Sequence, residues 1–153
     1  MIRVIRTDST NADFRSLIRQ LDLDLSNRYG EAQSFFDQFN IVDHIRNVVV
    51  AYYNDIPAGC GAFKPYSEKD VEIKRMFVVP ELRRKGISSR ILSELELWAS
   101  SLEFTGAILE TGKGQHEAIG VYTKRNYTVI ENYGQYAGVE LSICMRKDFD
   151  PLG

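Results

Sequence analysis

The sequence predicts an α+β fold, in which helices cover both faces of a twisted, mixed, mostly antiparallel sheet. Three observations lead to this prediction. Residues 48–53 and 58–63 are apolar runs of strand length that are joined by a turn at 54–57. Residues 87–102 carry apolar side chains at helical spacing. Two further strand patterns, at 127–132 and 139–145, close the chain.

The N-terminal part of the chain predicts a strand followed by helices. Residues 2–7 alternate apolar and polar side chains as a strand does, and residues 9–11 are three polar residues that can cap a helix. We expect a polar break at 27–30 and a second, weaker helix at 31–39. One face of the first helix would carry Phe14, Leu17, Ile18, Leu21 and Leu25.

The rest of the chain predicts four more strands and a short helix. The strands are expected at 71–79, 106–109, 127–132 and 139–145, and the helix at 115–125. On the long helix at 87–102, the polar residues Arg90, Ser93, Glu94 and Glu96 are expected to face away from the core. Its buried face is expected to comprise Ile87, Ile91, Leu92, Leu95, Trp98, Ala99 and Leu102.

Composition predicts one cytoplasmic domain over residues 1–153. The chain is 44% hydrophobic and 26% charged, as ordinary globular domains are. Its net charge of -2 argues against nucleic-acid binding, and we expect no signal peptide, no membrane span and no metal site. Cys60 and Cys144 lie in apolar runs, which predicts buried free thiols. The oligomeric state is not determined, and a homodimer is left open.

A cationic turn follows the strand at 71–79 and leads into the long helix. Unpaired N–H groups at a helix start attract anions, small residues let a phosphate approach the backbone, and cations add charge. We therefore expect this turn to bind a pyrophosphate, although a merely solvated turn is the alternative. The turn consists of Arg83, Arg84, Lys85, Gly86, Ile87, Ser88 and Ser89.

Two other glycine-rich segments do not fit phosphate-binding motifs. In residues 106–114 the glycine spacing is wrong, and Gly114 stands where a P-loop needs a hydroxyl residue for magnesium. The segment from Gly59 begins like a dinucleotide fingerprint, but Lys64 occupies its third glycine position and no helix follows. A nucleotide-binding regulator is therefore disfavoured.

Three segments in order along the chain resemble the GNAT family of N-acetyltransferases. Residues 72–78 look like the central strand of that family. Residues 83–88 match its loop pattern Arg/Gln-x-x-Gly-x-Gly/Ala except that Ser88 takes the last position. Residues 118–127 are similar to its Ala-x-x-x-Tyr-x-x-x-Gly-Phe signature, with Asn126 for glycine and Tyr127 for phenylalanine. Asparagine tolerates a left-handed helix end better than most residues, so the first of these replacements is conservative.

The resemblance implies a GNAT-like acyl-CoA N-acyltransferase fold with acetyl-CoA as cosubstrate. The strands at 71–79 and 106–109 would be parallel neighbours that splay apart, so that backbone groups of Phe77 and Val78 pair with the pantetheine arm. Gln115 resembles the family's polar residue that contacts the same arm. The implied reaction is transfer of an acetyl group to the amine of a small molecule. Acetylation of a protein or peptide amine, or acyl-CoA binding without catalysis, are the alternatives.

Glu72 and Tyr122 are the candidate catalytic residues that the resemblance implies. An alkyl amine with a pKa of about 10 lies about six units above an ordinary glutamate, a gap of roughly 8 kcal/mol. We therefore expect Glu72 to act from a buried position or through a water chain. Tyr122 would stabilise the departing sulfur by a hydrogen bond and not by full proton transfer, because a phenol is a weaker acid than a thiol. The alternatives are a solvent-facing Glu72 and a Tyr122 that only packs.

The acids and aromatics of residues 21–40 suggest how a cationic acceptor would be recognised. In this fold class the first two helices commonly cover the acceptor side, and carboxylates beside aromatic rings suit an ammonium group. The alternative is that these acids only cover solvent-facing helix turns. The cluster consists of Asp22, Asp24, Tyr29, Glu31, Phe35, Phe36 and Asp37.

Overall fold

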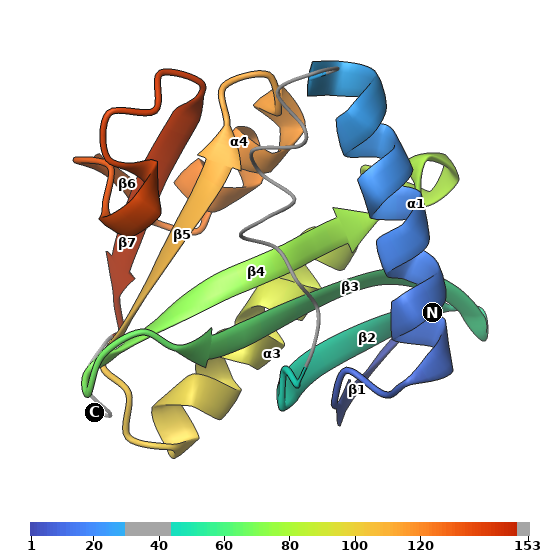
Figure 1. Cartoon of the computed structure of the whole chain (residues 1–153). Helices are drawn as coiled ribbons and strands as arrows, with labels where there is room; N and C mark the ends of the chain where they lie inside the picture. The colour runs from blue at the N-terminus through green and yellow to red at the C-terminus, as the bar shows by residue number, and fades with distance from the viewer. Residues whose placement is uncertain (30–43, 150–153) are drawn as a thin grey trace. The chain divides into compact units, whose positions relative to one another are not determined.

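The computed structural model describes residues 1–29 and 44–149, and it confirms the predicted mixed sheet. Its strands hydrogen-bond in the order β1–β2–β3–β4–β5–β7–β6. They are β1 (Ile2–Thr7), β2 (Asn47–Tyr53), β3 (Ile56–Pro65), β4 (Asp70–Val78), β5 (Gly106–Gly112), β6 (Thr128–Ile130) and β7 (Ser142–Asp148). The helices drawn in Figure 1 are α1 (Ala12–Tyr29), α3 (Ile87–Ser101) and α4 (His116–Lys124).

The chain forms two compact units. The first unit contains residues 1–64 and 74–95, and the second contains residues 65–73 and 96–153. Strand β4 pairs with β5 in parallel, as predicted, and this pairing joins residues 70–73 to residues 106–109 of the second unit. The pairs β1–β2, β2–β3, β5–β7 and β6–β7 are antiparallel.

Helix α1 supplies much of the core of the first unit. The Asn11 side chain caps the helix, because its Oδ1 accepts the backbone N–H of Phe14 at 2.9 Å. The helix continues through Tyr29, so the predicted break is wrong at residues 27–29, and the predicted helix at 31–39 lies outside the described residues. The five predicted apolar residues are buried and form one cluster with residues of β2, β3 and the end of β4, including Val48, Val50, Tyr52, Cys60, Ala62 and Phe77.

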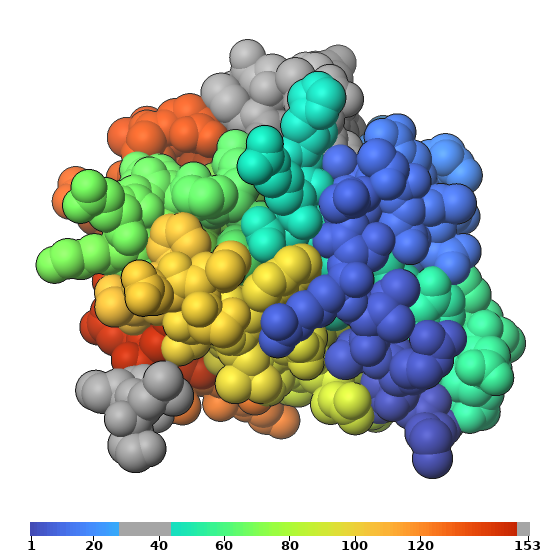
Figure 2. Space-filling view, turned by 90° about the horizontal axis from the view of Figure 1, so that it is seen from below, coloured from blue at the N-terminus to red at the C-terminus, as the bar shows by residue number. Residues whose placement is uncertain are grey.

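Gly59 and Gly61 allow α3 to cover the other face of β3, and a Cβ at Gly59 would lie 3.1 Å from Cδ1 of Ile91. A Cβ at Gly61 would lie 2.8 Å from Cγ2 of Ile91 and 3.0 Å from Cδ1 of Leu95, so only glycine lets the helix pack this closely. Successive residues of a strand point to opposite faces, and Cys60 accordingly packs in the cluster around α1. The prediction of helices on both faces is therefore confirmed. Strand β1 lies beside α3 on the surface shown in Figure 2, where Arg6 Nε is 2.6 Å from Glu94 Oε2.

The β2–β3 turn and the end of α3 differ from the prediction. Asn54 and Asp55 both have left-handed backbone, with φ of 49° and 67°, so the turn needs only two residues and β3 starts at Ile56. Leu102 lies beyond the end of α3 and is exposed, whereas it was expected in the buried face. Glu96 was expected to face solvent but is buried, because its carboxylate accepts hydrogen bonds from Arg125, Tyr127 and Lys147.

The second unit has one polar and one apolar strand face. Strand register places Glu72 opposite Ile108 in β5, so that Glu110 follows on the same face. The apolar face carries Val71, Ala107, Leu109 and Met145, all essentially buried. The polar face carries Asp70, Glu72, Glu110, Ser142 and Arg146. Among the described residues, no helix combines the length and apolar character needed to cross a bilayer.

Candidate active site

The cationic turn has the backbone geometry of an anion site. Strand β4 ends at Val78, a 3-10 helix covers Pro80–Leu82, and α3 begins at Ile87. Between them, Arg84 and Gly86 have left-handed backbone, with φ of 68° and 80°. The N–H of Arg90 donates to the Gly86 carbonyl at 3.1 Å, so the helical ladder begins there. The N–H groups of residues 87–89 precede this ladder and point out of the helix start.

The turn also has room for an anion at this place. A Cβ built at Gly86 would meet nothing within 4 Å, which leaves the backbone open to a ligand atom. Arg84 and Lys85 are exposed, and Nζ of Lys85 lies 5.1 Å from the centroid of the Tyr53 ring. Ile87 is buried and anchors the helix start in the core. Open backbone, helix N–H groups and two exposed cations together fit a phosphate group.

Arg83 is held differently from the other two cations. Its Nε donates to the carbonyl of Val78 at 3.0 Å, and its guanidinium lies 5.8 Å from the centroid of the Phe77 ring. The structure therefore brings together three predicted cofactor residues, Phe77, Val78 and Arg83, at the end of β4. A pantetheine amide that pairs with the Val78 carbonyl would share this acceptor with Arg83.

Glu72, in the second unit, is buried and accepts a hydrogen bond from a tyrosine. Its side chain is 4% exposed, so it is not the solvent-facing strand residue of the alternative reading. The Tyr133 hydroxyl donates to its Oε2 at 2.7 Å. Burial in the first place, and the neighbouring Glu72 carboxylate in the second, raise the pKa of Tyr133. The phenol therefore stays protonated and remains a donor to this carboxylate.

Tyr122 lies in α4 with its ring buried. Its ring centroid is 5.8 Å from that of Tyr127. Burial and the charge of Glu110 raise the pKa of Tyr122 well above its ordinary value. At neutral pH the hydroxyl is therefore a hydrogen-bond donor and a poor proton source, as the sulfur-bonding role requires. Gln115 is the N-cap residue of the same helix, and its N–H donates to the Gly112 carbonyl at 3.0 Å.

Glu110 is a polar residue of this unit that sequence reasoning did not select. Its Oε2 accepts the Ser142 hydroxyl at 2.6 Å, and its charge acts on both Tyr122 and Tyr136. The signal that identifies it is the register of two strands, because Glu110 follows the residue opposite Glu72 by two positions. Register between distant strands cannot be read from local sequence.

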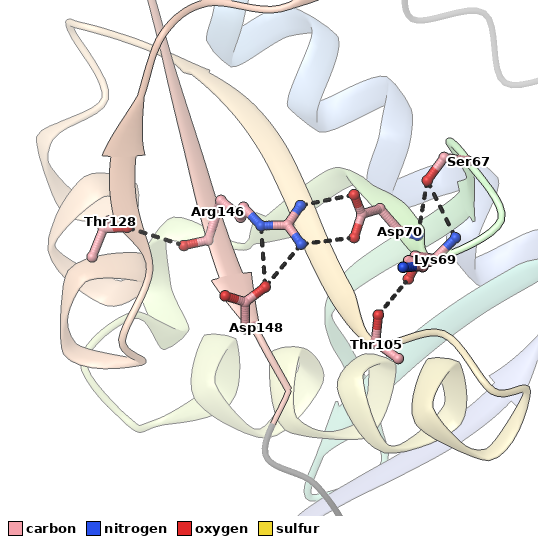
Figure 3. A network of polar contacts seen from close by, with 7 residues as sticks. All are labelled: Ser67, Lys69, Asp70, Thr105, Thr128, Arg146 and Asp148. Carbon is pink, nitrogen blue, oxygen red and sulfur yellow. Dashed lines mark hydrogen bonds and ion pairs between the residues drawn. The ribbon is translucent and has the colours of Figure 1, made fainter.

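An ion-pair network fixes the other end of the same polar face (Figure 3). The Arg146 guanidinium donates to both oxygens of Asp70, at 2.7 and 3.0 Å, and also to Asp148 at 2.8 Å. Gly106 lies beneath this pair, and a Cβ there would be 2.8 Å from both Arg146 Nη2 and Asp70 Oδ1. The first residue of β4 is thereby tied to β7 across β5. This network supports the strands that carry Glu72 and Glu110.

Of the acidic cluster predicted at residues 21–40, the structure describes only the part within α1. Asp22 accepts Nη1 of Arg75 at 2.9 Å, so this carboxylate is engaged with a strand residue. Arg75 is mostly buried and has left-handed backbone, with φ of 61°. The side chain of Tyr29 and the residues Glu31, Phe35, Phe36 and Asp37 lie outside what the structure describes.

Comparison with known proteins decides the family. The model of the Acetyltransferase (GNAT) family matches residues 12–127, which include the cationic turn, Glu72 and Tyr122. The chain belongs to the GNAT family of acetyltransferases. It is 32% identical to the IAA acetyltransferase of Azospirillum brasilense over 133 residues, which are 86% of this chain and 87% of that protein.

Solved structures agree with this assignment. A Klebsiella pneumoniae protein described as an acyl-CoA N-acyltransferase superposes with a TM-score of 0.82 at 26% identity, over 98% of this chain and 99% of that one. A GNAT acetyltransferase from Elizabethkingia anophelis, solved with acetyl-CoA bound, has a TM-score of 0.69 at 16% identity and covers 97% of this chain and 98% of its own. At that identity the second likeness concerns the fold alone.

Proposed function

We propose that this GNAT acetyltransferase transfers the acetyl group of acetyl-CoA to the amine of a small molecule. The observation that carries the proposal is the cationic turn, whose open Gly86 and helix start suit the pyrophosphate of coenzyme A. Acetyl-CoA is the cosubstrate that the family implies, and it is bound in a structure of the same fold. The small-molecule acceptor is supported by the name of the Azospirillum relative, which states a substrate, IAA, for that protein.

In the proposed reaction, the bound thioester supplies the acetyl group, a C–N bond forms to the amine as the C–S bond breaks, and the amine loses one proton. Glu72 takes that proton directly or through water, because it is a buried carboxylate on β4, the strand that resembles the central strand of the family. Tyr122 donates a hydrogen bond to the sulfur as negative charge develops there. Arg84, Lys85 and the helix start hold the pyrophosphate.

A panel of amines with detection of free thiol tests this proposal. Purified protein is mixed with acetyl-CoA and with small aliphatic amines, small aromatic amines or peptides, each in a separate arm, and a sample without acceptor measures background hydrolysis. We expect thiol release above background with at least one small amine, together with the acetylated product by mass spectrometry. Release with peptides alone would replace the small-molecule assignment. Calorimetric binding of acetyl-CoA without thiol release in any arm would indicate a binding module.

A further inference from the structure

The hydroxyl of Tyr133 donates a hydrogen bond to one oxygen of the buried Glu72 carboxylate, and the two residues are 61 positions apart in the sequence. Tyr133 lies in the segment between β6 and β7, directly before the 3-10 helix Gly134–Tyr136, whereas Glu72 lies in β4. The contact is therefore formed by the tertiary structure and not by local chain geometry. At 2.7 Å it is as short as hydrogen bonds to a charged oxygen usually are.

Three contacts hold the Tyr133 side chain and backbone in place. The Tyr66 ring packs edge-on against the Tyr133 ring at 5.2 Å and 71°, and the Tyr136 ring does so at 5.7 Å and 87°. The Tyr133 carbonyl accepts the backbone N–H of Tyr136 at 2.9 Å, so the 3-10 turn holds the main chain as well. Tyr136 is 1% exposed and forms the buried side of this arrangement. The hydroxyl thus lies on a ring that cannot turn away without breaking packing.

We propose that Tyr133 is a positioning residue for acetyl transfer, which orients the Glu72 carboxylate by donating its hydroxyl to Oε2. The inference rests on the proposed role of Glu72 as the base. A carboxylate on a flexible side chain samples several orientations, and a general base works only from the one that reaches the proton. Tyr133 selects one of these orientations.

Tyr133→Phe removes the hydroxyl and keeps the ring packing, so it isolates the bond. We expect kcat to fall about tenfold, the lower end for a hydrogen bond to a charged group, while the KM for acetyl-CoA stays unchanged. Tyr66→Phe is the matched control, since it removes a hydroxyl from the neighbouring ring of the same packed row, and it should match the wild type in both measurements.

The double variant Glu72→Gln/Tyr133→Phe separates positioning from packing. If Tyr133 acts through Glu72, the double variant is no slower than Glu72→Gln alone. Losses that multiply would show a packing role and overturn the proposal, as would a Tyr133→Phe enzyme with wild-type kcat. A Glu72→Gln enzyme with wild-type turnover would instead overturn the base assignment on which the proposal rests.

Discussion

Gly86→Val should separate backbone strain from ligand access at the cationic turn. Gly86 has φ of 80°, which valine adopts poorly, and a Cβ there meets nothing within 4 Å. The stability loss is therefore backbone strain without a clash, about 1–2 kcal/mol. For a chain of this size that corresponds to a melting temperature lower by roughly 2–4 °C per kcal/mol. The folded variant should still be the main species at room temperature.

Binding should suffer more than strain alone explains, because the β-branched side chain occupies the open space through which a phosphate would approach. We expect the Kd for acetyl-CoA to rise at least tenfold, equivalent to about 1.4 kcal/mol of lost binding free energy. Isothermal calorimetry on the folded variant measures this directly. The same change should appear with coenzyme A, because the pyrophosphate is common to both ligands.

Gly138→Val is the matched control for this experiment. Gly138 also has left-handed backbone, with φ of 76°, and a Cβ there also meets nothing within 4 Å. It therefore carries similar strain, but it lies in the segment before β7 and has no proposed role in holding the pyrophosphate. Its melting temperature should fall by a similar amount while its Kd for acetyl-CoA stays at the wild-type value. The turn would lose its pyrophosphate role if Gly86→Val bound acetyl-CoA within threefold of wild type.

Three further variants test the role of Tyr122 in catalysis, the ion pair of Arg146 with Asp70, and the loss of stability at alkaline pH. Tyr122→Phe should bind acetyl-CoA normally and turn over about 10²-fold more slowly, and a rate within twofold of wild type would leave Tyr122 with packing alone. Arg146→Met should lower the unfolding free energy, measured in urea, by about 1–3 kcal/mol, because it removes two hydrogen-bond donors from Asp70. The control Arg3→Met removes an exposed ion pair and should change the unfolding free energy by less than about 0.5 kcal/mol. Equal losses in the two variants would refute this reasoning. Burial, with a neighbouring carboxylate, raises the pKa of Tyr52 from 10.0 to about 12, so its stabilising effect is present below pH 10 and is lost as the pH rises through 12. Urea titrations across this pH window should show a smaller loss in Tyr52→Phe than in wild type, and an equal loss would contradict the assignment.

Local sequence patterns predicted most of the elements, because each pattern reflects the geometry of a single element. The helical face of residues 14–25 and the cap at Asn11 depend on neighbours within a turn or two, and both are confirmed. The left-handed backbone of Asn126, with φ of 74°, follows from the same short-range logic. The role of Tyr122 in turnover and the role of the cationic turn in binding pyrophosphate remain predictions.

Long-range contacts account for what the sequence did not reveal. The last strand was predicted at 139–145 but runs from Ser142 to Asp148, because Arg146 and Lys147 are strand residues whose charges are matched by Asp70 and Glu96 far away in sequence. A local pattern treats such charges as the end of a strand. The bond from Tyr133 to Glu72 was missed for the same reason, since nothing near either residue indicates the other.

The buried Glu96 on α3 has a consequence for how this sequence can change during evolution. Its carboxylate accepts Tyr127 at 3.0 Å, Arg125 at 3.0 Å and Lys147 at 2.8 Å. Replacing Glu96 alone by an apolar residue leaves two cations and a hydroxyl without their shared acceptor, and replacing one donor leaves the carboxylate undercompensated. A related sequence that lacks this cluster must therefore have changed several of its residues together. Glu96, Arg125, Tyr127 and Lys147 should accordingly be inherited as a group.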